Sequence, residues 1–376
     1  MLDIHIWTGP AWETWSPDSL STGIGGSETA AIQMSKHLTQ RGHKVTVHGV
    51  VEGTWDDVTY VHYGNTLNRS IPIPCDVLVT SRQPFILHEN KFRARASFIW
   101  AHDVNVGLST EVNEALFKAD RILALSEWHR SYLKSVYPFL PDHKIFVTRN
   151  GIDTDLYARA ARKTGNRLIY ASSPDRGIER LLQLFPQIQS RVPDVELHVY
   201  YGFNTWEAMA DHSQNQAQRQ KLDYYKRMLI HQAPAGVHFH GRVGQEELAS
   251  AYLASKVLAY CTWFSETSCI SAMEAQAAGC VPVTTALAAL RETVKHGLLI
   301  DPPDDSPDYA RTFIENVVTL LTNDGLRLRL ATTARYWALS SLSWRDVALQ
   351  WEELFGDLLN EKKRLTTLHV PPYEGA

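Results

Sequence analysis

Residues 264–283 read FSETSCISAMEAQAAGCVPV, and this stretch decides what fold to expect. It opens with small and hydroxyl-bearing residues that are typical of a loop, and apolar residues then recur at the spacing of one helix face. Thr267 or Ser268 is predicted to cap this helix, because each side chain offers an oxygen to the first free N–H groups. Gly279 ends the helix and a buried strand follows at once. This order of loop, helix and strand is typical of an α/β protein.

Two carboxylates flank the predicted helix start, Glu266 in the loop and Glu274 beside the buried face. A helix N-terminus favours an anion such as phosphate, because its first N–H groups are unpaired and its dipole is positive there. A carboxylate beside a buried face is costly unless something pairs with it, and ligand hydroxyls are one such partner. The alternative is a surface glutamate in a loop and another on a solvated helix edge.

Outside this stretch, short apolar runs alternate with amphipathic segments. Strands are expected at 2–7, 44–50, 75–80, 96–101, 121–126 and 145–148, and again at 167–172, 195–202, 236–243, 257–260, 281–283 and 297–300. Most of these strands are separated by predicted helices, which indicates parallel sheets. A length of 376 residues favours two domains.

The composition excludes several classes of protein. The net charge of −4 gives no signal for nucleic acid, and no apolar run approaches the roughly 20 residues that span a bilayer. The first residues lack the basic start and apolar core of a signal peptide. The four cysteines form no CxxC pair, which argues against disulfides and cysteine zinc sites and fits the reducing cytoplasm.

Candidate ligand-binding residues lie near predicted strand ends, where open α/β sheets bind ligands. Gly25 and Gly26 precede a helix, His102 and Asp103 directly follow a strand, and Arg176 lies just before a helix start. The glycines do not form GxGxxG directly after a strand, which argues against an NAD enzyme.

Glu266, seven intervening residues, Glu274, Gly279 and Pro282 together resemble the signature of retaining glycosyltransferases of the GT-B fold, family 4. The resemblance implies two Rossmann-like, doubly wound parallel-sheet domains facing a cleft. It implies an acceptor-side domain at 1–150, a donor-side domain at 151–340, a helix at 341–364 that returns to the first domain, and a loose tail at 365–376.

The same resemblance implies roles for individual residues. Glu266 would contact the hydroxyls of the donor sugar, Glu274 would bind the ribose, and His102 would approach the sugar. Arg176 stands at the lysine position of the family's diphosphate grip. The upstream Gly-Arg of that grip is absent, and Arg242 is a candidate to supply the charge. Further donor-binding residues implied are Gly25 and Gly26 of the glycine loop, and the amides of Thr267, Ser268, Cys269 and Ile270.

No metal or other cofactor is expected. Asp153 and Asp155 match the DxD sequence pattern of a metal site, but such sites belong to the other main glycosyltransferase fold. A turn with a capping aspartate is a sufficient explanation of the pattern. No residue stands out as a covalent nucleophile, which fits a front-face reaction with retained configuration. The leaving diphosphate would take the acceptor proton, with Arg176 stabilising its charge.

The predicted function is transfer of a sugar from a UDP- or GDP-sugar to a hydroxyl of a glycan, a lipid-linked or another acceptor. A nucleotide-sugar epimerase and a catalytically silent sugar-nucleotide-binding protein are the alternatives. The sequence does not identify the acceptor. Trp12, Trp15 and Trp128 could stack on a sugar, although most such tryptophans belong to a core. Lys91, Arg93 and Arg95 could touch an anionic lipid or polymer, but a solvated charge run explains them better.

Overall fold

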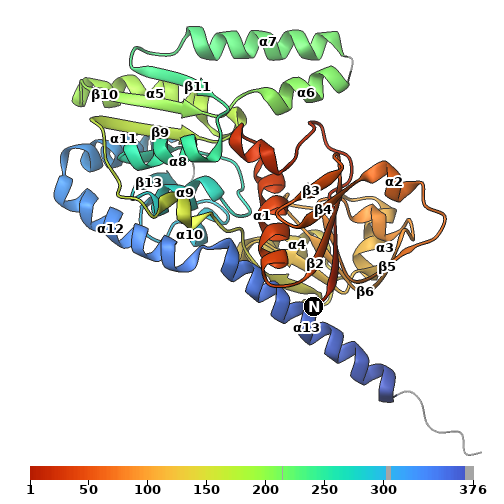
Figure 1. Cartoon of the computed structure of the whole chain (residues 1–376). Helices are drawn as coiled ribbons and strands as arrows, with labels where there is room; N and C mark the ends of the chain where they lie inside the picture. Colours follow the sequence, from red (N-terminus) through yellow and green to blue (C-terminus); the bar gives the residue numbers. More distant parts are fainter. Residues whose placement is uncertain (214, 302–305, 369–376) are drawn as a thin grey trace, which may run out of the picture.

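The computed structural model describes residues 1–213, 215–301 and 306–368. The chain forms two α/β domains side by side, each built on its own sheet (Figure 1). Apolar residues of the strands and of the helix faces that cover them fill a separate core in each domain. The sheets are almost entirely parallel, as the alternation of strands and helices predicts.

The N-terminal sheet has eight strands in the order β3-β4-β2-β1-β5-β6-β7-β8. Its strands are β1 (Asp3–Trp7), β2 (Lys44–Gly49), β3 (Gly53–Trp55), β4 (Val58–His62), β5 (Ile73–Ser81), β6 (Phe92–Trp100), β7 (Arg121–Ala124) and β8 (Ile145–Val147). Only the edge strand β3 runs antiparallel to its neighbour. The carboxyl ends of β1, β5 and β6 therefore share one edge of the sheet.

The C-terminal sheet has six parallel strands in the order β11-β10-β9-β12-β13-β14. They are β9 (Asn166–Ala171), β10 (Val195–Tyr200), β11 (Val237–Gly241), β12 (Val257–Tyr260), β13 (Val281–Thr285) and β14 (Leu298–Ile300). The strand order reverses direction beside β9, between β10 and β12. In open α/β sheets, this point leaves a crevice at the carboxyl ends of the strands.

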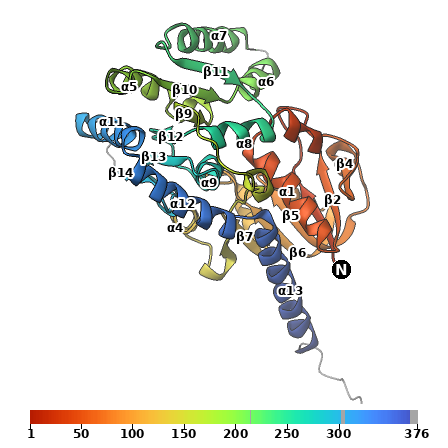
Figure 2. The same cartoon turned by 60° about the vertical axis from the view of Figure 1, so that its left-hand side comes forward.

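Helices cover both faces of each sheet (Figures 1 and 2). Those of the N-terminal domain are η1 (Pro17–Ser21), α1 (Gly26–Gln40), α2 (Tyr63–Leu67), η2 (Pro84–Leu87), α3 (Thr110–Lys118), α4 (Glu127–Val136) and η3 (Asp142–Lys144). Those that follow are η4 (Thr154–Tyr157), η5 (Pro174–Arg176), α5 (Ile178–Arg191), α6 (Asn204–His212), α7 (Gln216–His231), α8 (Gln245–Ala254), α9 (Ile270–Ala277), α10 (Leu290–Thr293), α11 (Pro307–Thr322), α12 (Asp324–Ser341) and α13 (Trp344–Leu368). Within the described residues, no helix is both long and apolar enough to cross a bilayer.

The last helix, α13, packs against the N-terminal domain although it follows the C-terminal one (Figure 1). The Trp351 indole lies edge-on to Trp100 of β6, with ring centres 4.6 Å apart, and its N–H donates to the Thr148 hydroxyl at 2.9 Å. The chain therefore crosses between the domains twice, after β8 and before α13. The expected loose tail begins inside this helix, which continues to Leu368, and residues 369–376 lie outside the described residues.

The two crossings meet at Gly151. The Ile152 N–H donates to the Leu342 carbonyl at 2.8 Å, and the Trp344 N–H donates to the Ile152 carbonyl at 3.4 Å. A Cβ on Gly151 would lie 2.8 Å from the Trp344 backbone nitrogen and 2.9 Å from its Cα. Only glycine lets the two chain segments approach this closely.

Gly151→Ala is expected to destabilise the protein by about 1–3 kcal/mol, because the backbone of Trp344 has to move to admit the methyl group. Thermal unfolding measures the loss. Gly356→Ala is the matched control: Gly356 lies inside α13 with no heavy atom within 4 Å of the added Cβ. It is expected to be neutral or to add about 0.5–1 kcal/mol, as alanine does in a helix. Equal melting temperatures for the two variants would contradict the close approach.

Candidate active site

Glu266 and Arg176, which the sequence separates by 90 residues, form an ion pair at the carboxyl ends of the C-terminal strands. Arg176 Nη1 lies 3.1 Å from Glu266 Oε1, and the same oxygen accepts a hydrogen bond of 2.6 Å from the Tyr260 hydroxyl. The guanidinium carbon of Arg176 lies 3.2 Å from the centre of the Phe264 ring. Burial alone would lower the pKa of Arg176, but Glu266, together with further negative groups that include Asp175, outweighs it and the net shift is upward.

Local chain geometry places this pair. Gly177, which follows Arg176, has a φ of 117° and starts α5. A Cβ there would lie 2.5 Å from the Cys261 carbonyl, so glycine lets the loop after β9 pack against the end of β12. The Glu266 carbonyl accepts the Ala289 N–H at 3.1 Å, which ties the motif loop to the segment after β13. Arg176 and Glu266 are therefore held by backbone contacts as well as by each other.

Glu274 lies on α9, partly buried between two tyrosine hydroxyls. Burial raises the pKa of Glu274 to about 7, and the nearby Tyr157 hydroxyl offsets this shift only in part. The hydroxyl oxygens of Tyr157 and Tyr252 are buried, and they interact with Glu274 and with Ser271, respectively. A carboxylate whose charge is this costly is suited to accept hydrogen bonds from a ligand.

The residues between the two glutamates connect the domains. Thr267 and Ser268, expected to cap α9, do not: Cys269 is the N-cap residue and its side chain makes no capping bond. The Thr267 hydroxyl instead donates to the His102 carbonyl at 2.8 Å, and the Ser268 hydroxyl accepts from the Asn150 N–H at 3.4 Å. The prediction was wrong because contacts to the other domain use the hydroxyls that a local cap would need.

The remaining residues of the motif loop also lie at the domain boundary. A Cβ on Gly26 would lie 3.5 Å from the Ile270 side chain, so the glycine loop at the start of α1 faces this loop. Cys269 is buried, and burial raises the pKa of its thiol well above the usual value, which makes it unsuited to act as a nucleophile. Gly25, the N-cap residue of α1, has no side chain to offer, so the first N–H groups of α1 depend on other partners.

His102 follows β6 and presents a neutral imidazole. Burial, assisted by the nearby Arg82 charge, lowers the pKa of His102 to about 3. Its Nε2 is buried and has no hydrogen-bond partner within the part of the chain that the structure describes. Its backbone carbonyl is the acceptor for Thr267. A buried imidazole nitrogen without a partner, next to the motif loop, is available to a ligand hydroxyl.

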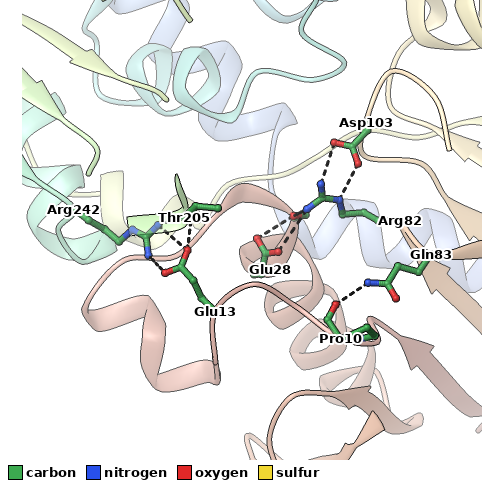
Figure 3. A network of polar contacts seen from close by, with 9 residues as sticks. Pro10, Glu13, Glu28, Arg82, Gln83, Asp103, Thr205 and Arg242 are labelled. Carbon is green, nitrogen blue, oxygen red and sulfur yellow. Dashed lines mark hydrogen bonds and ion pairs between the residues drawn. The ribbon is translucent and has the colours of Figure 1, made fainter. Parts of the chain in front are cut away.

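Asp103, the other candidate that follows this strand, pairs with Arg82 (Figure 3). Arg82 Nε and Nη2 donate to the two carboxylate oxygens of Asp103 at 2.9 and 3.2 Å, and Nη1 donates to the Ser27 hydroxyl at 3.2 Å. Arg82 directly follows β5 and has a φ of 63°, unusual for a residue other than glycine. Sequence reasoning missed it, although its place after a strand end is the signal that identified His102.

A second network joins the two domains at Arg242, which follows β11 (Figure 3). Its Nη1 and Nη2 donate to the Glu13 carboxylate at 2.6 and 3.1 Å, and Nη2 also donates to the Thr205 hydroxyl at 2.8 Å. Burial would raise the pKa of Glu13, but these bonds outweigh it and hold the pKa below its usual value. Arg242 therefore already has a carboxylate partner, contributed by the other domain.

The tryptophans considered for stacking on a sugar lie in different surroundings. Trp15 is buried in the N-terminal core, whereas the Trp12 side chain is exposed and lies edge-on to His212. Trp128 stacks on Tyr132.

Asp153 accepts the Asp155 N–H at 3.1 Å as the cap of η4, which is the structural role expected for this Asp-x-Asp sequence. In the basic run, Lys91 donates to the Arg69 carbonyl and Arg95 pairs with Asp76, while Arg93 is exposed.

Comparison with known proteins agrees with this arrangement. Residues 159–337, which include Arg176, Glu266 and Glu274, match the family described as Glycosyl transferases group 1. The chain is 28% identical over 214 residues to phosphatidyl-myo-inositol mannosyltransferases of Mycobacterium tuberculosis and Mycobacterium bovis. That alignment covers 54% of this chain, and the chain spans about half, 51%, of the length of these relatives.

Solved structures match over nearly the whole chain. Sucrose-phosphate synthase from Thermosynechococcus elongatus superimposes with a TM-score of 0.72 at 16% identity, covering 96% of this chain and 100% of that one. Anabaena HepE in complex with UDP-glucose gives 0.68 at 14% identity, covering 95% and 100%. The expected fold, two Rossmann-like domains of the GT-B type, is confirmed, and the match to Glycosyl transferases group 1 covers most of the second domain.

Proposed function

We propose that the protein is a retaining glycosyltransferase that moves a sugar from a UDP- or GDP-sugar to an acceptor hydroxyl without a catalytic metal. The observation that carries the proposal is the Arg176–Glu266 pair, together with the partly buried Glu274 eight residues after Glu266. All three residues lie in the region that matches Glycosyl transferases group 1. The names of the relatives, a mannosyltransferase and a sugar-phosphate synthase, support the reaction class. A lipid-linked acceptor is in keeping with the first of these names.

The reaction would proceed on one face of the sugar. The bond from the anomeric carbon to the diphosphate oxygen breaks, the acceptor oxygen bonds to the same face, and its proton passes to the leaving diphosphate. Arg176 would stabilise the negative charge that develops on the leaving diphosphate oxygen. Because its guanidinium is already held in place, little reorganisation of the site is needed as the bond breaks. Glu266 and the neutral His102 would hold sugar hydroxyls, and Glu274 would accept hydrogen bonds from the ribose.

A thermal-shift panel tests the proposal. The ligands are UDP, GDP, ADP, their common sugar conjugates and NAD, with and without Mg²⁺, on the wild type and on Glu274→Ala. We expect one nucleotide to raise the melting temperature without Mg²⁺, by mass action on the folded state, and the variant to lose that rise. A response to NAD alone, or to none of the ligands, would contradict the proposal. Product analysis with the best donor then separates transfer from epimerisation and from binding without turnover.

Glu13→Gln is expected to tighten donor binding about threefold to tenfold, or ~1 kcal/mol, because the Glu13 carboxylate competes with the donor diphosphate for Arg242. Calorimetric titration with the donor measures the change. Glu207→Gln, which removes a carboxylate paired with Lys226 on nearby α7, controls for net charge. Unchanged affinity in Glu13→Gln would remove Arg242 from the proposed donor site.

A further inference from the structure

Three histidines and a glutamate gather on one face of the C-terminal sheet, at strands that the proposed reaction does not use. Glu196 and His198 alternate along β10, and His238 and His240 alternate along the edge strand β11. His198 lies directly opposite His238 in the parallel register. Because side chains two apart on a strand point to the same face, all four are directed to one side.

The donor atoms of three of these residues converge. His198 Nε2 lies 3.2 Å from Glu196 Oε2, His238 Nε2 lies 4.0 Å from Glu196 Oε1, and all three residues offer ligand atoms within 4.8 Å of one another. Donors around a tetrahedral zinc, at bonds of about 2.0–2.1 Å, lie about 3.3 Å apart. The His198 side chain is only 8% exposed and fixed, whereas those of Glu196 and His238 are about half exposed and can move closer.

We propose that Glu196, His198 and His238 bind a zinc ion, with water as the fourth ligand. Two imidazoles and one carboxylate form a ligand set that suits Zn²⁺ and disfavours Mg²⁺ and Ca²⁺, which take oxygen ligands. The site differs from the metal position that was considered at Asp153 and Asp155, and it gives the ion no part in sugar transfer.

His240 supplies the supporting contact that a zinc-binding histidine needs. Its Nε2 lies 2.9 Å from His198 Nδ1, the nitrogen that faces away from the cluster. With zinc on Nε2, His198 carries its proton on Nδ1 and donates it to His240, which fixes the tautomer and the ring orientation. The His240 ring is itself held by stacking on Tyr200, with ring centres 4.3 Å apart.

One nearby cation limits the affinity. Arg167 Nη2 lies 3.9 Å from Glu196 Oε2, so the ion would share this carboxylate with a positive charge. We therefore expect binding in the low micromolar range rather than the tight binding of buried structural sites. Zinc would join β10 to β11 by their side chains. β10 leads to α6, which carries Thr205, and β11 leads to the loop that carries Arg242.

Metal titration of the full chain tests the proposal. After removal of metal with EDTA, ZnCl₂ is titrated by calorimetry, and Co²⁺ is added for its visible absorption, which reports tetrahedral coordination. We expect one equivalent of Zn²⁺ to bind and raise the melting temperature, and Mg²⁺ to have no effect. His238→Ala and Glu196→Gln should each weaken zinc binding at least tenfold. The control His143→Ala changes an exposed histidine in the other domain and should bind as the wild type does.

Two results would overturn the zinc site. One is the absence of saturable, one-to-one Zn²⁺ binding by the wild type. The other is wild-type affinity in both His238→Ala and Glu196→Gln. Because both side chains are about half exposed, the variants should fold, and their metal-free melting temperatures check this. Neither result depends on a nucleotide sugar, so the outcome is independent of the proposed transferase function.

Discussion

Glu266→Gln is expected to lower turnover about 10²- to 10³-fold while changing donor affinity only slightly. The carboxylate fixes the Arg176 guanidinium and accepts the Tyr260 hydroxyl, and in the proposed reaction it also holds the sugar. Glutamine keeps the shape but loses the charge, so the preorganised cation beside the leaving group is less well placed. Loss of one preorganised group of this kind typically costs a factor of 10² to 10³ in kcat.

Steady-state kinetics with the donor found by thermal shift measures the effect as a fall in kcat at nearly constant KM. Glu246→Gln, which changes an exposed glutamate in the first turn of α8, is the matched control and should behave as the wild type. Tyr260→Phe removes one hydrogen bond to Glu266 but leaves its charge, so a smaller loss, within about tenfold, is expected. Wild-type kcat in Glu266→Gln would remove this residue from the catalytic site.

The elements of the fold that the sequence predicts are those with a strong local pattern. The buried strands and the helix after the motif loop follow from apolar spacing, and Ser126 caps α4 as its hydroxyl allows. The hairpin of β3 and β4 has a local signal too, which the sequence reasoning passed over. Asp56 and Asp57 join its strands with φ values of 49° and 61°, the left-handed pair that a tight hairpin turn uses.

The contacts that complete the candidate site have no such signal. Glu13 and Arg242 are 229 residues apart, and nothing in either stretch of sequence indicates that they meet between the domains. Likewise, Thr267 looks like a capping residue by its local pattern, and only the position of the other domain shows that its hydroxyl bonds to His102. Local sequence patterns predict which side chains can form hydrogen bonds, whereas the packing of the two domains determines the partner of each one.

Glu274→Gln is expected to weaken binding of the nucleotide-sugar donor about 10²-fold, or ~3 kcal/mol. In the proposed site the carboxylate accepts hydrogen bonds from ribose hydroxyls, and bonds to a charged acceptor contribute about 1.5–3 kcal/mol each. Calorimetric titration measures the loss, with Glu246→Gln again as the control. The substitution keeps the side-chain volume beside Tyr157 and Tyr252, so packing is not expected to account for the change.

The raised pKa of Glu274, about 7, gives this prediction a pH dependence. Below pH 7 the carboxyl in the free protein is protonated, and the donor has to displace that proton to bind the charged form. Wild-type affinity should therefore rise with pH up to about 7 and level off above it, whereas Glu274→Gln should show no such rise. A nucleotide sugar is the ligand to use, because a free nucleoside diphosphate has a terminal phosphate that titrates in the same range.

Folding stability should change in the opposite direction. Because the folded state raises the pKa of Glu274 from 4.5 to about 7, this group's contribution to stability is full below pH 4.5 and is lost as the pH rises to 7. The loss is about 3 kcal/mol at most, and glutamine avoids it. Above pH 7, Glu274→Gln should therefore melt at a higher temperature than the wild type while binding the donor more weakly. If the variant instead melted at a lower temperature and bound the donor normally, Glu274 would be a structural residue of α9. Greater stability with weaker binding is what a carboxylate kept for its ligand predicts, since its buried charge is costly until a ligand pairs with it.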